Sequence, residues 1–185
     1  MKLLETLRLD AGRHYHFAGR DSSQVGSLAL LKVCLSHHFA PVLVFRLAHW
    51  CARHHLRPIG KLFSLVNVVV FGLEIGVDSE IGPGLFFPHT SGTVLGAGRI
   101  GANAVIYHNV TVGAKILDMQ NRPELRPAIG DDAFLGAGCK VLGGITLGDQ
   151  VTVGANAVVL KSVPSGCLVG GVPAVVLRQA EAAGE

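Results

Sequence analysis

Histidine is the residue type of this chain best suited to proton-transfer chemistry. Seven of the nine histidines lie before residue 74, and the other two are His89 and His108. An imidazole with an unperturbed pKa of roughly 6.5 can take a proton from a hydroxyl group near neutral pH. His89 and His108 therefore need a scaffold that holds them in place, and the sequence around them indicates one.

The remaining histidines and the cysteines do not form a recognisable metal site. The pairs His37-His38 and His54-His55 fall in segments of helical periodicity, where adjacent residues point in different directions and cannot easily chelate together. The cysteines show no Cys-x-x-Cys pair, which favours reduced thiols over a disulfide framework. They are Cys34, Cys51, Cys139 and Cys167. The sequence predicts no metal site.

A period of six residues runs through 129–164. An aliphatic residue opens each hexad and Gly follows it in four of the six hexads. A helix repeats its apolar positions every three or four residues and a strand every two, so a period of six predicts a short strand and a turn stacked on their neighbours. We expect the opening residues to stack inside the solenoid, with strands about 4.8 Å apart. They are Ile129, Leu135, Val141, Leu147, Val153 and Val159.

The same repeat begins near residue 74 and is interrupted once. Its earlier hexads open at Ile75, Ile81 and Phe87 and, after one extra residue, at Val94, Ile100, Ile106 and Val112. Between 116 and 127 the phase is lost in a polar, proline-rich stretch, which predicts a loop extruded from the stack. Loops on a rigid scaffold are favoured places for binding. We place the solenoid at 74–178 and expect 179–185 to fray.

Residues 1–73 have the pattern of a helical segment. Apolar residues at spacings of three and four predict three helices, at Ser27–Phe39, Pro41–His55 and Pro58–Phe71. The stretch 62–73 is the most apolar, but its twelve residues are too few to span a bilayer, which takes roughly twenty. We expect it to be part of a buried packing helix.

Charge is distributed unevenly. Residues 1–73 hold nine Lys or Arg against three acidic residues, whereas 74–185 hold seven against ten. The basic helices could contact an anionic membrane surface, or could simply present a solvated face while packing on the solenoid. The first residues lack the apolar run of a secretory signal, so we expect a cytoplasmic protein, with peripheral membrane contact as an option.

The solenoid resembles the hexapeptide-repeat acyltransferases and, within them, the serine acetyltransferases and the short serine-acetyltransferase-like proteins of polysaccharide biosynthesis. The matching elements are LEIGVDSEIGPGLFFPHTSG, AVIYHNVTVGA, the hexads from RPAIG to KSVP, and GGVPAVVL. The resemblance implies a left-handed parallel β-helix with a small N-terminal helical part. It also implies a homotrimer that uses acetyl-CoA at active sites between subunits. We expect neither a metal nor a nucleic-acid partner.

Two residues match the catalytic positions of that family. His89 stands at the catalytic histidine, which implies a general base that deprotonates a hydroxyl as it attacks the thioester. Glu74 stands fifteen residues earlier, at the position of the aspartate that orients this histidine. A carboxylate there would fix the imidazole tautomer, although glutamate is longer by one methylene.

The acceptor positions depart from the family pattern. Pro88 replaces an acidic residue, and Leu125-Arg126 replaces an Arg-His pair in the extruded loop. An amino acid acceptor thereby loses an anchor for its ammonium group, although Arg126 could still meet a carboxylate. We therefore favour a saccharide hydroxyl in surface polysaccharide biosynthesis, with L-serine as the alternative acceptor. His108 is a further candidate acceptor contact.

Small residues match the family's cofactor groove, where backbone groups contact the pantetheine arm. Lys140, Lys161 and Arg178 are candidates for the phosphates of CoA, with ordinary surface roles as the alternative. The groove candidates are Gly113, Ala114, Gly136, Ala137 and Ala155. The sequence thus favours an acetyl-CoA-dependent O-acetyltransferase, and a non-catalytic β-helix scaffold is the alternative from another class.

Overall fold

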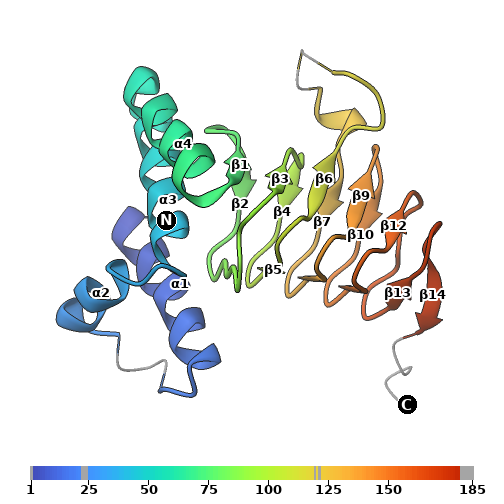
Figure 1. Ribbon diagram of the computed structural model, residues 1–185, viewed down its shortest axis with the longest axis horizontal. Coiled ribbons are helices and arrows are strands. Elements are labelled where there is room, and N and C mark those ends of the chain that lie inside the picture. The colour runs from blue at the N-terminus through green and yellow to red at the C-terminus, as the bar shows by residue number, and fades with distance from the viewer. Residues whose placement is uncertain (1, 22–24, 119, 121, 180–185) are drawn as a thin grey trace.

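The chain folds into a helical part followed by a β-helix, as seen in a computed structural model (Figure 1). The structure describes residues 2–21, 25–118, 120 and 122–179. Four helices stand at one end of the stack, and the strands then follow one another along its axis to β14 at the other end. The fraying expected for 179–185 concerns residues that, apart from Gln179, lie outside the described ones.

The described residues of the helical part form four α-helices, one more than the three that the sequence predicts. Its helices are α1 (Leu3–Phe17), α2 (Ser27–Cys34), α3 (Ala40–Arg53) and α4 (Arg57–Phe71). Charged residues interrupt the apolar pattern of α1, because this helix buries only Leu7, Asp10 and Ala11. The segment predicted as a helix over Ser27–Phe39 ends at Cys34, and a turn over 35–39 leads into α3.

Helix α4 is not the buried helix that its composition predicts. Only Gly60 and Asn67 are buried, and Asn67 donates a hydrogen bond to the Pro41 carbonyl of α3 at 3.1 Å. Leu62, Leu65 and Val69 are more than half exposed. The helix therefore packs along one side on α3 and presents apolar side chains to solvent on the other.

Three parallel sheets form the walls of the β-helix. The first is ordered β1 (Leu73–Ile75), β3 (Thr93–Leu95), β6 (Thr111–Gly113), β9 (Lys140–Leu142), β12 (Val158–Val159). The second is ordered β10 (Thr146–Leu147), β7 (Ala128–Ile129), β4 (Arg99–Ile100), β2 (Glu80–Ile81). The third is ordered β14 (Val175–Arg178), β13 (Leu168–Gly170), β11 (Thr152–Val153), β8 (Phe134–Leu135), β5 (Val105–Ile106). Only β14 is antiparallel to its neighbour among the described strands, and it pairs with β13 at the end of the stack.

The hexad residues form the core, with one correction. The opening residues of the six hexads from 129 to 164 are buried, as predicted. Val94, however, is 36% exposed and Leu95 is 2% exposed, so the prediction of Val94 as an inward residue is wrong. The turn after Phe87 holds more residues than the count allowed, because buried Thr93 fills the corner and donates to the Tyr107 carbonyl at 3.0 Å.

The predicted loop is present and leaves the stack after β6. It projects beyond the edge of the β-helix in Figure 1 and contains a short 3-10 helix, η2 (Pro123–Leu125). The chain rejoins the stack at β7. Among the described residues, no helix is long and apolar enough to cross a membrane.

Candidate active site

One corner of the β-helix carries four of the predicted site residues in a single row. Phe86 pairs with Val105, Val105 with Phe134, and Phe134 with Thr152 in successive coils. The residues three positions further on in each coil therefore occupy the same corner, because parallel strands stack in register. These residues are His89, His108, Ala137 and Ala155.

The turn that carries His89 is tied to the junction between α4 and β1. Thr90 Oγ1 donates to the Phe71 carbonyl at 2.7 Å, and the Gly92 N–H donates to the Gly72 carbonyl at 2.9 Å. His89 itself is exposed beside this turn. The imidazole is thus held on a fixed backbone and open to a ligand, as a general base must be.

His89 lies in a hollow of about 320 Å³ between the turn and the helical part. Its polar lining includes His37, His38 and the backbone around Pro88, and no carboxylate is among the described residues that line it. The rings of His89 and His108 are 5.7 Å apart between centroids, at 77°. The structure therefore brings His89, Pro88 and His108 together, and their roles stay predictions.

Sequence reasoning missed His38. Its ring centroid lies 6.2 Å from that of His89, at 65°. Burial lowers the pKa of His38, and the neighbouring His37 and His89 lower it further, while a hydrogen bond with the Pro88 backbone acts in the opposite direction. The sequence carries no signal for this contact, because the turn over 35–39 reaches the site only through the packing of the helices.

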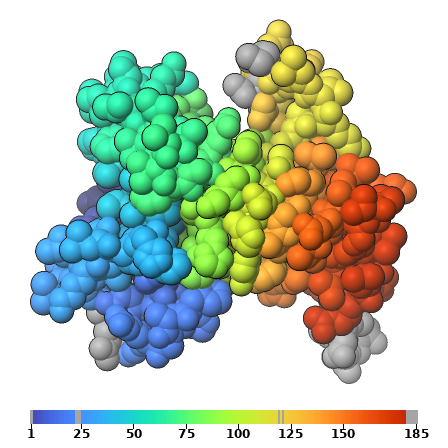
Figure 2. All heavy atoms as spheres, in the orientation of Figure 1, coloured from blue at the N-terminus to red at the C-terminus, as the bar shows by residue number. Residues whose placement is uncertain are grey.

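Glu74, Gly113 and Arg126 open onto a second hollow, of about 690 Å³. It lies against β1, β3 and β6 and the base of the loop, and Figure 2 shows the surface hollowed between the helical part and the loop. Glu74 is exposed at the middle of β1 and pairs with Val94. The orientation of His89 by Glu74 stays a prediction, because within this single chain the two side chains line different hollows.

Arg126 fastens the loop to the β-helix. Its Nη1 donates to the Gly96 carbonyl at 2.9 Å, and its Nη2 lies 3.3 Å from the carbonyl of Asp118 and 3.4 Å from its carboxylate. Asp118 also accepts the Arg122 N–H at 2.8 Å. Burial raises the pKa of Asp118, but the hydrogen bonds and the charge of Arg122, together with the backbone of Gln120, lower it on balance. Arg126 therefore has a structural role in addition to the predicted contact with substrate.

The cofactor candidates lie on the two corners that flank the first sheet. Ala137 and Ala155 belong to the row of His89, and the Asn156 N–H donates to the Ala137 carbonyl between them. A Cβ on Gly136 would approach the Val153 carbonyl to 2.7 Å, so glycine is needed there for close stacking of the coils. A Cβ on Gly113 would meet no atom within 4 Å, which leaves space for a ligand.

The remaining cofactor candidates are placed as follows. Ala114 follows β6 at the start of the loop, and Lys161 is exposed after β12. Lys140 donates to the Asn109 carbonyl beside the His89 row. Arg178 lies on the exposed strand β14. Of these cations, Lys140 is the one beside the row of small residues.

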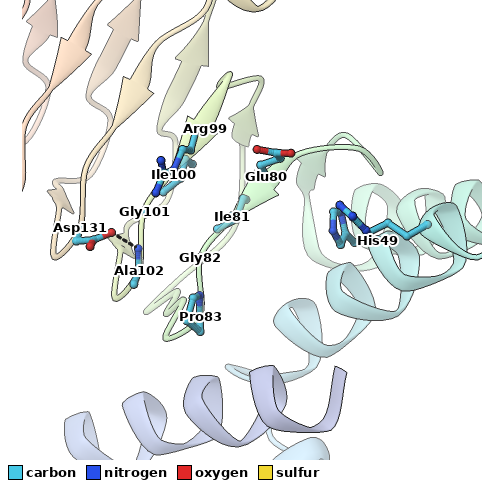
Figure 3. A pocket seen from close by; sticks show the side chains of 11 residues that line it. His49, Glu80, Ile81, Gly82, Pro83, Arg99, Ile100, Gly101, Ala102 and Asp131 are labelled. Carbon is cyan, nitrogen blue, oxygen red and sulfur yellow. Dashed lines mark hydrogen bonds between the residues drawn. The ribbon is translucent and has the colours of Figure 1, made fainter. Parts of the chain in front are cut away.

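A third hollow, of about 440 Å³, lies on the other side of the helical junction and contains none of the predicted site residues. It is lined by the second sheet and by His49 of α3 (Figure 3). Within it, the Ala102 N–H donates to the Asp131 carboxylate at 2.7 Å, and Glu80 pairs with Arg99 across β2 and β4. Side chains of both charges line this hollow, with Arg53 and Arg99 beside Glu80 and Asp131.

Comparison with known proteins identifies the fold and the family. Residues 126–161 match the family described as "Bacterial transferase hexapeptide (six repeats)". A serine acetyltransferase from Helicobacter pylori is 39% identical over 126 residues, covering 68% of this chain and 72% of that protein. A serine acetyltransferase structure from Brucella abortus is 30% identical, with a TM-score of 0.78, and covers 96% of this chain and 69% of that one.

These matches show the left-handed β-helix of hexapeptide repeats. The chain belongs to the serine acetyltransferase family. The chain spans only part of the length of some relatives: a serine acetyltransferase from Synechococcus elongatus, 36% identical over 140 residues, is covered over 56% of its length, and 75% of this chain is aligned.

Two further solved structures of serine acetyltransferases are complexes with small molecules. A serine acetyltransferase from Neisseria gonorrhoeae "in complex with serine" is 27% identical, with a TM-score of 0.76 over 94% of this chain and 68% of that one. A serine acetyltransferase in "Complex with CoA" is 25% identical, with a TM-score of 0.74 over 95% of this chain and 69% of that one.

Proposed function

We propose that this chain is an acetyl-CoA-dependent O-acetyltransferase in which His89 is the general base. The observation that carries the proposal is the position of His89, exposed on a fixed turn at the head of a row of small residues in a β-helix of this family. His108 lies beside it, and Ala137 and Ala155 leave room along the same corner.

The reaction needs no covalent enzyme intermediate. Neutral His89 takes the proton of the acceptor hydroxyl as its oxygen attacks the thioester carbonyl of acetyl-CoA. The tetrahedral intermediate then collapses, the carbon–sulfur bond breaks, and the imidazolium returns the proton to the leaving thiolate. Backbone N–H groups near Gly113 and Ala114 are the proposed donors to the oxyanion. The products are an O-acetyl ester and free CoA thiol.

Orientation of His89 by Glu74 belongs to the proposal. The carboxylate is exposed on the first sheet and would have to reach the second imidazole nitrogen across the α4–β1 junction. Such a contact would fix the tautomer and stabilise the imidazolium. Contact between Lys161 and the phosphates of CoA also belongs to the proposal, because the Lys161 side chain is exposed at the end of a coil.

The acceptor has two candidates. The relatives named serine acetyltransferase favour L-serine, and this is the better supported of the two. One observation favours a saccharide hydroxyl instead. The described residues that line the hollow of His89 include imidazoles but no carboxylate, so none of them offers an anionic partner to an ammonium group.

Assembly and location complete the proposal. A cytoplasmic homotrimer would place the hollow of Glu74 and Arg126 from one subunit near the corner of His89 from another, as the resemblance implies. The exposed apolar side of α4 supports some contact, either with another chain or, in a protein with basic helices, with an anionic membrane surface. Light scattering would detect assembly with further copies of the chain, and flotation with vesicles of anionic lipid would detect membrane contact.

An acceptor screen tests the proposed activity. CoA thiol release would be measured with L-serine, with neutral saccharides and without acceptor, alongside calorimetry with acetyl-CoA. Acceptor-dependent release supports the enzyme, and its acceptor decides between the two candidates. Absence of acetyl-CoA binding would instead favour the scaffold.

A further inference from the structure

A histidine of the helical part contacts the candidate catalytic histidine. His38 belongs to the turn between α2 and α3, but its ring stands edge-on to that of His89, 6.2 Å away between centroids. Both side chains line the same hollow. The helical part therefore contributes directly to the environment of His89, although it lies far from it in sequence.

Two other imidazole rings lie next to the ring of His89, one from the β-helix and one from the helical part. His108, from the next coil, lies at 5.7 Å and 77°, and His38 lies at 6.2 Å and 65°. Edge-to-face contacts of this kind favour one relative orientation of two rings. His38 supplies the contact that the β-helix alone cannot provide.

His38 is itself held in place. The next residue, Phe39, is 1% exposed in the core, and the rings of His37 and His14 lie 3.9 and 6.3 Å from that of His38. The His38 imidazole lies beside the backbone of Pro88, which acts on its pKa. Because proline has no N–H, the carbonyl is the only backbone hydrogen-bonding group of Pro88, and it belongs to the peptide that leads into His89.

A neutral His38 imidazole suits a contact with the backbone carbonyl of Pro88. The titratable groups that face His38 are His37 on its own turn, His14 of α1 and His89, and none of them is an acid. Burial and the neighbouring imidazoles lower the pKa of His38. A neutral imidazole keeps one N–H, which suffices to donate to the Pro88 carbonyl.

We propose that His38 is a positioning residue for His89: it fixes the Pro88–His89 peptide and packs edge-on against the catalytic ring. The inference rests on the proposed function, because it assigns His38 a role in that reaction. It also gives the helical part a function in catalysis beyond covering the end of the β-helix.

The first test is kinetic. His38→Ala is expected to lower kcat by about tenfold to a hundredfold, because small displacements of a catalytic group have effects of this size, while the KM for acetyl-CoA stays unchanged. His38→Asn and His38→Gln each carry an amide N–H near the place of one ring nitrogen, and one of them is expected to restore much of the rate. His54→Ala, in the turn after α3, is the matched control.

The second test does not need an acceptor. Carbon-13 relaxation of the His89 ring is expected to show greater mobility in His38→Ala than in the wild type or in His54→Ala. If the wild type releases no thiol with any acceptor but this difference is present, the proposed function fails and the positioning contact holds. Unchanged ring mobility together with wild-type kcat in a folded His38→Ala variant would overturn the inference.

Discussion

Asp10 and Arg46 form a buried ion pair that joins the helical part to the first coil of the β-helix. The carboxylate of Asp10 on α1 accepts hydrogen bonds from Arg46 on α3 at 2.8 and 3.1 Å. Asp10 also accepts the N–H groups of Gly84 and Leu85, and Arg46 donates to the carbonyls of Ile81 and Gly82. One pair thus satisfies backbone groups of the coil that leads to His89.

Removal of either partner is expected to destabilise the fold strongly. Asp10→Ala leaves the guanidinium of Arg46 buried without its counter-ion, and breaking such a pair costs about 3–5 kcal/mol. Urea unfolding measures the change. Arg57→Ala is the matched control, because its pair with Asp78 is 56% and 61% exposed and should contribute less than about 1 kcal/mol. Equal effects of the two variants would contradict the account.

Stability is expected to decrease as the pH falls below about 6.5. Burial is the main cause that lowers the pKa values of His14, His38 and His49 in the folded state. The unfolded chain therefore binds these protons first, and the folded state is favoured most above the unfolded pKa. The urea midpoint should fall between pH 7.5 and 5.5.

A variant isolates this effect. His14→Gln should show a smaller difference between the midpoints at the two pH values than the wild type does, whatever its stability at pH 7.5. A wild-type midpoint that is constant or rises toward pH 5.5 would be inconsistent with buried neutral histidines.

Arg126 is expected to control the order of the extruded loop. Arg126→Ala removes its hydrogen bonds to Gly96 and Asp118, and the loss should weaken the docking of the loop by about 1–3 kcal/mol. Amide hydrogen exchange of the loop should rise. Arg122→Ala also loses a contact with Asp118, but its side chain is 46% exposed, so exchange should change little. Equal protection of the loop amides from exchange in the two variants would contradict the role of Arg126 as the anchor of the loop.

The cysteines should differ in reactivity. All four are free, and burial raises the pKa of Cys139 to about 12 and also raises that of half-buried Cys34. Iodoacetamide at pH 8 should therefore label Cys34 first and leave Cys139 unmodified in the native protein. Peptide mass spectrometry would locate the label, with urea-unfolded protein as the reference. Early labelling of Cys139 would contradict its burial.

The β-helix could be predicted from the sequence because every coil repeats the same local rule. When aliphatic residues recur every six positions, a stacked coil can bury all of them only by turning each one inward. The prediction that Ile129 and the opening residues of the later hexads are buried is therefore confirmed. The rule failed at Val94, where the turn that carries His89 departs from the repeat. The irregularity lies at the candidate site, where a ligand needs an exposed side chain.

The helical part was harder to predict because packing, and not periodicity, decides it. Nothing in the residues 36–39 indicates that His38 reaches His89, since this depends on how α3 packs on α1 and α4. The same holds for α4, whose apolar composition predicts burial although Val69 is 74% exposed. Helix α1 was missed because its buried face includes the charged Asp10.

The central claim is that His89 removes the proton of the acceptor. The most direct measurement compares CoA thiol release and ester formation by the wild type and by His89→Asn, with the best acceptor of the screen. We expect the variant to lose activity by a factor of about 10²–10⁴, while its circular dichroism and acetyl-CoA affinity stay as in the wild type. Turnover by His89→Asn equal to that of the wild type would contradict the account.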